Sequence, residues 1–220
     1  MSAPATLGQT VADALREALR AGTIGVGERL IELALTQRYQ VSQAAVRDGL
    51  HQLEREGWVV YEARRGVRVR RFSPDAAHEI FALMAEIEAL ALIWAVKEQP
   101  RRVLLDALHQ PLEVARRAHD GGAWPERQAA LLDFHAVIAA LSARPQTPVL
   151  LAVLHNQSAL LMTDFELHGT PDAHRDAQMT GYEHVYGVLR FGGVDEAQAA
   201  LRARIHDDGT PIVRWLAGRS

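Results

Sequence analysis

The side chains best suited to contacting DNA bases lie at the start of one predicted helix. Ser42, Gln43, Ala44 and Arg47 fall in the first turns of a helix expected over residues 42–56. Arginine can donate a forked pair of hydrogen bonds to guanine or bind a phosphate, and the amide of glutamine matches adenine. A serine that caps the helix, together with free backbone N–H groups, suits a phosphate. The pattern predicts a recognition helix in the major groove.

A second cationic group lies at the tip of a predicted hairpin. Arg64, Arg65 and Gly66 connect two segments, residues 58–62 and 67–70, that have the composition of strands. Glycine allows close approach of the backbone, and arginines suit the narrow minor groove. We therefore expect this hairpin to act as a wing that contacts the same DNA.

Ten histidines raise the alternative of an enzyme. The nearest approximations to a metal motif are His119-Asp120 and Asp133-Phe134-His135, and neither has a partner carboxylate at ligand spacing. No Glu-x-x-His pair, nucleophile motif or phosphate loop occurs, and the chain contains no cysteine. These features favour a protein that is not an enzyme. The alternative is an all-α metal-dependent enzyme that contains histidines and carries an accessory winged helix.

The predicted elements divide the chain into two domains. Helical spacing of apolar residues over 11–19, 31–39 and 42–56, followed by the two strands, indicates a winged helix-turn-helix in residues 1–72. Residues 73–220 show only helical patterns, which proline and glycine divide into about six helices. The expected fold is mainly α, with an antiparallel helical bundle as the second domain.

Charge differs between the two domains. Residues 1–72 contain 11 arginines and 8 acidic residues, whereas residues 73–220 contain 13 basic and 19 acidic residues. A basic domain suits a polyanionic partner. The acidic domain would repel such a partner, so we expect it to have a different function. The first ten residues lack the basic and apolar segments of a secretion signal, and no apolar stretch is long enough to span a bilayer. We expect a cytoplasmic protein without a membrane partner.

The first domain resembles the DNA-binding domain of the GntR family of bacterial regulators. The matching residues are Gly27-Glu28-Arg29-Leu30, Val41-Ser42, Val46-Arg47-Asp48, Leu50, Leu53-Glu54 and Glu56-Gly57. The remainder is similar to the FCD effector domain of the FadR type, in its shorter six-helix, VanR-like form. The resemblance implies a homodimer that binds operator DNA and a small-molecule effector.

This resemblance places Ser42, Gln43, Ala44, Arg47 and Gly66 at DNA-contact positions. The family usually has Arg-Thr-Pro where this chain has Gln-Ala-Ala after the serine. The change removes the arginine, which reads bases, and the threonine, which donates a hydrogen bond to phosphate. We therefore expect an operator that differs from the family's commonest one.

Family members often hold a divalent metal through an aspartate and three histidines, the first two as Asp-x-x-x-His. His135 matches the first histidine, but Leu131 stands at the aspartate position. When the later apolar residues of this chain are aligned with those of the family, Tyr182 and Arg204 fall at the other two ligand positions. We call this alignment the apolar register. The resemblance thus implies no metal cofactor here.

A second register would place His184 and His206 at those two positions. With His135, and with Asp133 as a further carboxylate, they would then form the metal site. That register also buries charged residues such as Asp207, which is costly. We therefore adopt the apolar register and predict no metal ligand.

The apolar register directs His135, Tyr182 and Arg204 into one cavity. An arginine there can bind an anionic metabolite directly. The family's first effector helix contains an Arg-x-x-x-Glu pattern, in which Met84 replaces the arginine and Glu88 matches. We expect His135, Tyr182, Arg204 and Met84 to contact the effector.

The first effector helix also has apolar residues to spare for a dimer interface, namely Ile80, Leu83, Ile87, Leu90, Ala91 and Trp94. Two-fold dimers read two half-sites about one turn of DNA apart. The resulting prediction is a transcription regulator, and more specifically a repressor, whose operator affinity a small anionic metabolite controls.

Overall fold

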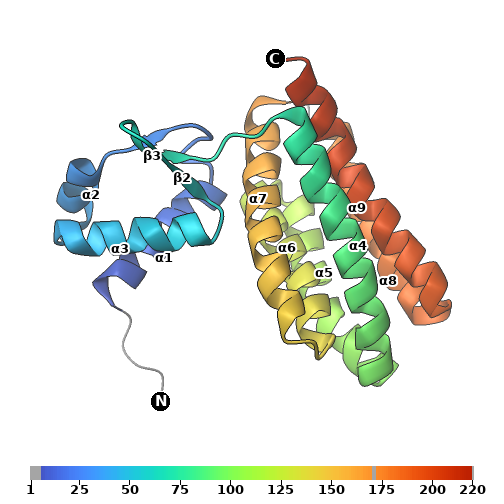
Figure 1. Cartoon of the computed structure of the whole chain (residues 1–220). Helices are drawn as coiled ribbons and strands as arrows, with labels where there is room; N and C mark the ends of the chain where they lie inside the picture. Colours follow the sequence, from blue (N-terminus) through green and yellow to red (C-terminus); the bar gives the residue numbers. More distant parts are fainter. Residues whose placement is uncertain (1–5, 170–171, 220) are drawn as a thin grey trace. The chain divides into compact units, whose positions relative to one another are not determined.

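The computed structural model describes residues 6–169 and 172–219, and the chain forms two compact units, Met1–Arg71 and Phe72–Ser220 (Figure 1). The fold is mainly α, with a winged helix-turn-helix first and an all-helical bundle second, which confirms the predicted fold class. No helix within the described ranges is long and apolar enough to cross a membrane.

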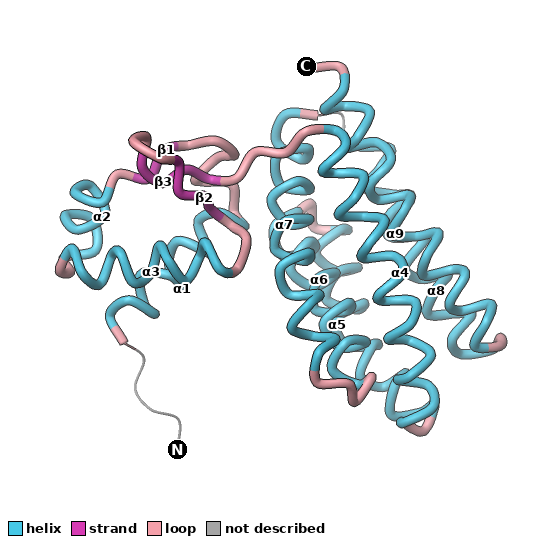
Figure 2. The backbone as a smooth tube through the Cα atoms, in the orientation of Figure 1, coloured by secondary structure: helices cyan, strands magenta, loops and turns pink. Residues whose placement is uncertain are grey.

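The first unit contains three helices and a small antiparallel sheet whose strand order is β1-β3-β2 (Figure 2). Its elements are α1 (Leu7–Arg20), β1 (Arg29–Leu30), α2 (Glu32–Tyr39), α3 (Gln43–Arg55), β2 (Val59–Glu62) and β3 (Gly66–Val69). Strand β1 was not predicted, because two residues show no periodicity and only pairing with β3 defines them.

Helices α1 and α3 pack closely through two glycines. A Cβ atom added at Gly49 would lie 2.9 Å from the carbonyl oxygen of Gly8, so only glycine fits at this crossing. The apolar faces around it bury Val11, Leu15 and Leu50. This packing fixes α3 against the rest of the unit and leaves its opposite face to solvent.

The described part of the second unit contains six helices, which agrees with the predicted bundle. They are α4 (Pro74–Glu98), α5 (Arg101–Asp120), α6 (Trp124–Leu141), α7 (Gln146–His168), α8 (Asp172–Phe191) and α9 (Val194–Ala217). The hydroxyl oxygen of Ser73 accepts a hydrogen bond from Ala76 N at 3.1 Å, so it caps α4 ahead of Pro74, which suits the first helical position.

Helix α4 contributes to much of the bundle core, because it packs against α6, α7 and α9. Two small residues bring α9 close to its neighbours. A Cβ atom at Gly209 would lie 2.5 Å from the Phe81 ring, and one at Gly181 would lie 2.5 Å from the Arg204 side chain. The absence of a side chain at Gly181 therefore provides the space that the buried Arg204 occupies.

Candidate functional site

The predicted DNA-contact residues of α3 lie together at the exposed N-terminal end of that helix. Ser42 caps α3 by accepting a hydrogen bond from Ala45 N at 3.2 Å, and the side chains of Gln43, Ala44 and Arg47 are exposed. A capped helix end that presents an amide and a guanidinium to solvent has the geometry of a recognition helix.

Glu32 of α2 holds two of these side chains. One of its carboxylate oxygens, Oε2, accepts hydrogen bonds from Gln43 Nε2 and from Arg47 Nε, each at 2.8 Å. These hydrogen bonds, that from Gln43 foremost, lower the pKa of Glu32, which stays ionised. Glu32 therefore orients both side chains, and it also places a negative charge beside them.

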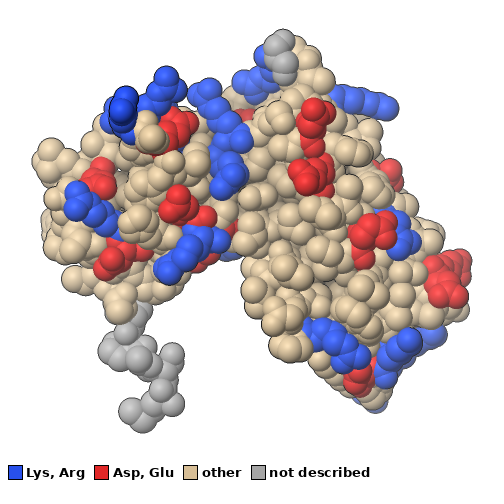
Figure 3. Space-filling view, in the orientation of Figure 1, with Lys and Arg blue, Asp and Glu red and all other residues tan. Residues whose placement is uncertain are grey.

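Arg64 and Arg65 lie in the turn between β2 and β3, Gly66 begins β3, and all three are exposed. Arg64 and Gly66 both have left-handed backbone conformations, with φ of 65° and 83°. Glycine tolerates this conformation best, which explains its place at the end of the turn. Figure 3 shows arginine side chains gathered over this hairpin end of the unit.

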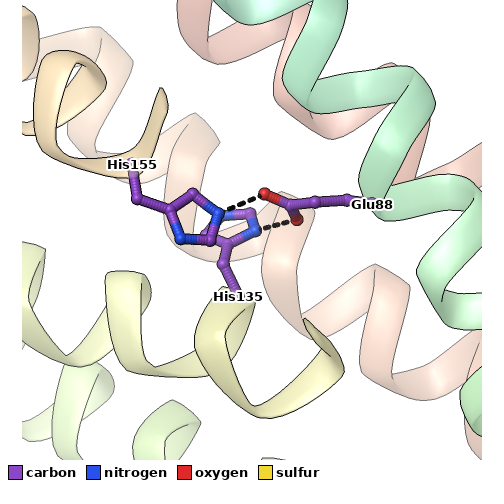
Figure 4. Close-up of side chains that lie close together, drawn as sticks. All are labelled: Glu88, His135 and His155. Atoms are coloured by element: carbon purple, nitrogen blue, oxygen red, sulfur yellow. Dashed lines mark hydrogen bonds and ion pairs between the residues drawn. The ribbon is translucent and has the colours of Figure 1, made fainter. Parts of the chain in front are cut away.

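A second candidate site lies inside the helical bundle and centres on Glu88 of α4. His135 of α6 and His155 of α7 both hydrogen-bond its carboxylate, His135 through Nδ1 and His155 through Nε2 at 2.7 Å (Figure 4). Glu88 has no exposed surface. Burial alone would raise the pKa of Glu88, but the charge and hydrogen bond of His135 and the hydrogen bond of His155 lower it to about 2.

The other ring nitrogen of His135 continues this chain of contacts. His135 Nε2 lies 2.5 Å from the hydroxyl of Tyr182 on α8, and that hydroxyl donates to Asp208 Oδ2 at 3.0 Å. Burial raises the pKa of Tyr182, so the hydroxyl is neutral and has one proton to donate. Both ring nitrogens of His135 then act as donors, which requires the charged imidazolium. Burial opposes that charge, but the Glu88 carboxylate outweighs it and raises the pKa of His135.

Asp208 of α9 closes the chain of contacts by pairing with a cation. Arg204 Nη2 donates to Asp208 Oδ1 at 2.7 Å, and Gln178 Nε2 donates to the same oxygen at 3.1 Å. Both partners of the ion pair are buried. We call Glu88, His135, Tyr182, Arg204 and Asp208 the buried polar cluster. Its two negative and two positive charges balance, which makes the burial of these groups tolerable.

A small internal cavity adjoins this cluster. Met84, Leu131, His135, Tyr182 and Asp208 are among the residues that line it, and it measures about 30 Å³. That volume holds one or two water molecules. The predicted effector residues Met84, His135 and Tyr182 therefore meet at one cavity. Arg204 is not among the lining residues, and its guanidinium donates to Asp208, which is one of them.

The two alternative registers differ in what they bury. Tyr182 and Arg204 are buried, whereas His184 and His206 are exposed, as the apolar register predicts. Asp133 is exposed as well. The alternative metal ligands therefore do not join the buried His135.

The positions of the family's metal ligands do not fit a metal in this chain. Leu131 has no donor atom, the Tyr182 hydroxyl already bonds His135 and Asp208, and Arg204 is a cation. Within the described ranges one group could hold a metal ion, namely Glu88, His135 and His155, whose ligand atoms lie within 4.8 Å of one another. Two imidazoles and a carboxylate suit zinc or a similar transition metal.

Sequence reasoning matched Glu88 to the family's Arg-x-x-x-Glu pattern but did not include it in the site, and it missed two further residues. Asp208 follows Arg204 by four positions on α9, a helical ion-pair spacing that is visible in the sequence. His155 lies on α7, separated from its partner Glu88 by 67 positions, and no spacing signals that contact.

Comparison with known proteins gives matches over both units. Residues 7–69 match the family model described as "Bacterial regulatory proteins, gntR family", and residues 79–207 match the FCD domain. A curated relative is the uncharacterized HTH-type transcriptional regulator YdhC of Bacillus subtilis, 25% identical over 107 residues, 49% of this chain. This match spans about half of that relative, 48% of its length.

Solved structures share the whole fold. A putative transcriptional regulator GntR from Rhodococcus sp. RHA1 has a TM-score of 0.81 at 23% identity, covering 94% of this chain and 97% of that one. The structure described as E. coli McbR/YncC has a TM-score of 0.77 at 19% identity, covering 98% and 99%. At these identities the likeness shows a common fold.

Proposed function

The chain belongs to the GntR family of bacterial transcription regulators and carries an FCD effector domain, and we propose that it is a homodimeric repressor controlled by a small anionic metabolite. The observation that supports operator binding is the exposure of Gln43 and Arg47 together at the capped end of α3, with the wing arginines in the same unit. A protein that binds operator DNA would act in the cytoplasm.

The test of operator binding is a fluorescence anisotropy titration with the DNA just upstream of the protein's own gene. Arg47→Ala should weaken specific binding by about 1–3 kcal/mol and reduce its dependence on salt. Arg55→Ala is the matched control, because Arg55 is exposed on α3 but lies about 12 Å further along the helix axis. Equal affinities of the two variants would refute the proposed role of Arg47.

A dimer interface is proposed on the exposed face of α4. Leu83 and Leu90 are 45% and 43% exposed and lie two turns apart, with the partly buried Ile87 between them. Ile80 and Ala91 are buried within the bundle of their own chain, so they are not available to a partner. A two-fold dimer through this face would place two recognition helices for two half-sites.

Effector control is proposed to act through the buried polar cluster. The anionic group of a metabolite could replace Asp208 as the partner of Arg204, with Met84, His135 and Tyr182 around it. Because the cluster joins α4, α6, α8 and α9, such a replacement would favour a different packing of these helices. Operator affinity would then change because the ligand binds one packing more tightly than the other.

This part is tested with the low-molecular-weight fraction of a cell extract as the source of effector. Arg204→Ala should abolish the effect of the extract on operator binding and leave binding itself intact. Arg202→Ala is the matched control, because Arg202 lies on the same helix and pairs with the exposed Glu86. An unchanged response of Arg204→Ala would exclude this assignment.

A further inference from the structure

A second hollow of the helical unit is larger than the cavity of the buried polar cluster. It lies where the end of α5 and the start of α6 face the start of α8, and it measures about 390 Å³. His119, Trp124, Arg127, Arg175 and Asp176 contribute to its lining. This volume falls in the range of small-molecule sites, whereas the inner cavity has room only for water in this packing of the helices.

One of the two arginines in the wall of this cleft, Arg127, is buried and poorly paired. Arg127 is 1% exposed, and its Nε has no hydrogen-bond partner among the described residues. Its Nη2 lies 3.4 Å from Glu166 Oε1, and that oxygen accepts a closer hydrogen bond, at 2.6 Å, from Arg175 Nε. A strong bond between a guanidinium and a carboxylate spans about 2.7–2.9 Å. Arg127 therefore has donor capacity that Glu166 does not satisfy.

Burial of such a cation is costly unless an anion accompanies it. Burial also lowers the pKa of Arg127, the direction expected when the charged form lacks water. An incoming anion that accepts hydrogen bonds from Arg127 would remove this cost. The open donor calls for a hydrogen-bond acceptor, and the positive charge of Arg127 favours an acceptor that is negatively charged.

Two further residues define the rest of the ligand. The Nδ1 atom of His119 is buried without a hydrogen-bond partner among the described residues, while its Nε2 lies 3.3 Å from Asp176 Oδ1. Trp124 adds an apolar, aromatic surface to the lining. Asp176 is largely exposed and places a negative charge on the wall, which disfavours a ligand that is anionic at both ends.

We propose that this cleft is a binding site for a small organic molecule with one anionic group, a carboxylate or phosphate that pairs with Arg127, and with an apolar part that packs on Trp124. The site uses residues outside the buried polar cluster, and the proposal does not depend on the repressor function. It requires only that the helical unit is folded.

The test is isothermal titration calorimetry on the full chain with benzoate and, separately, with inorganic phosphate, against sodium chloride at equal ionic strength. Saturable binding of either anion is expected, and which of the two binds distinguishes a carboxylate site from a phosphate site. Arg127→Gln should weaken this binding by at least about tenfold, because the charged donor is lost. Arg102→Gln is the control, since Arg102 is 91% exposed on α5 and pairs only with the exposed Asp106 among the described contacts.

Arg127→Gln can also disturb folding, so a second variant keeps the test decisive. Trp124→Leu keeps the cation and removes the aromatic surface, so it should weaken the binding of benzoate more than that of phosphate. Circular dichroism verifies that each variant is folded. Absence of saturable binding to the wild type, or equal affinities of the wild type and both cleft variants, would overturn the proposal.

Discussion

Replacing Glu88 with glutamine tests the central claim about the buried polar cluster. The substitution keeps the shape of the side chain and removes the negative charge that pairs with both His135 and His155. Glu88 is fully buried, so water cannot replace the lost interaction. We therefore expect Glu88→Gln to destabilise the helical unit strongly.

The magnitude follows from the pKa of the carboxyl group. Its fall from 4.5 to about 2 in the folded protein corresponds, at about 1.4 kcal/mol per pKa unit, to roughly 3 kcal/mol of stabilisation of the ionised form. Removing one partner of a buried ion pair generally costs about 3–5 kcal/mol. The two figures agree, and we expect a loss of about 3 kcal/mol in the free energy of unfolding.

The loss should depend on pH in a defined direction. The pKa of Glu88 is 4.5 in the unfolded chain and lower in the folded protein. Ionised Glu88 therefore stabilises the fold at pH values above 4.5, and this stabilisation is lost as the pH falls towards 2. The raised pKa of His135 contributes stability below its unfolded value of 6.5, and this is lost as the pH rises through the folded pKa. The difference in the free energy of unfolding between the wild type and the variant should therefore be largest between pH 4.5 and pH 6.5 and smaller on either side of this range.

Urea unfolding followed by circular dichroism across this pH range measures the difference directly. Glu86→Gln is the matched control, because Glu86 is on the same helix, 63% exposed, and pairs with Arg202 at the surface. Surface pairs contribute about 0–1 kcal/mol, so this variant should remain close to the wild type. If Glu88→Gln also stays within about 1 kcal/mol of the wild type across the range, Glu88 and His135 do not form the stabilising ion pair described here.

Four further predictions concern the recognition helix, the packing of the first unit, the dimer and the metal. Glu32→Gln should tighten operator binding severalfold in anisotropy, because it removes a negative charge beside Arg47; weaker binding would show that Glu32 acts mainly by orientation. Gly49→Ala should lower the free energy of unfolding by about 1–3 kcal/mol in urea, since its Cβ would meet the backbone of Gly8. Leu90→Glu should yield a monomer in sedimentation, and an intact dimer would move the interface elsewhere. Dialysis against EDTA should leave the melting temperature unchanged, because the family's metal positions lack ligands and both ring nitrogens of His135 already donate hydrogen bonds; a fall would point to a metal bound by Glu88, His135 and His155.

Much of the local structure was predictable from the sequence. Apolar periodicity located the helices of the first unit, proline and glycine marked the boundaries of those in the second, and Ser42 marked the start of α3 by its capping. Periodicity also selected the register that buries Tyr182 and Arg204 and exposes His184 and His206. These features depend on short-range spacing, which a sequence states directly.

The partners of the buried polar groups were decided only by the tertiary structure. Periodicity shows which face of a helix is buried but not which helix covers that face. The pairing of Glu88 with His155, and of Tyr182 with Asp208, joins residues from different helices far apart in the chain. The arginine predicted to meet an anionic effector is neutralised by Asp208, whereas Arg127, which no motif marks, is buried at 3.4 Å from Glu166 and its Nε has no hydrogen-bond partner among the described residues. Electrostatic balance depends on which charges meet in space, and packing of the six helices determines that.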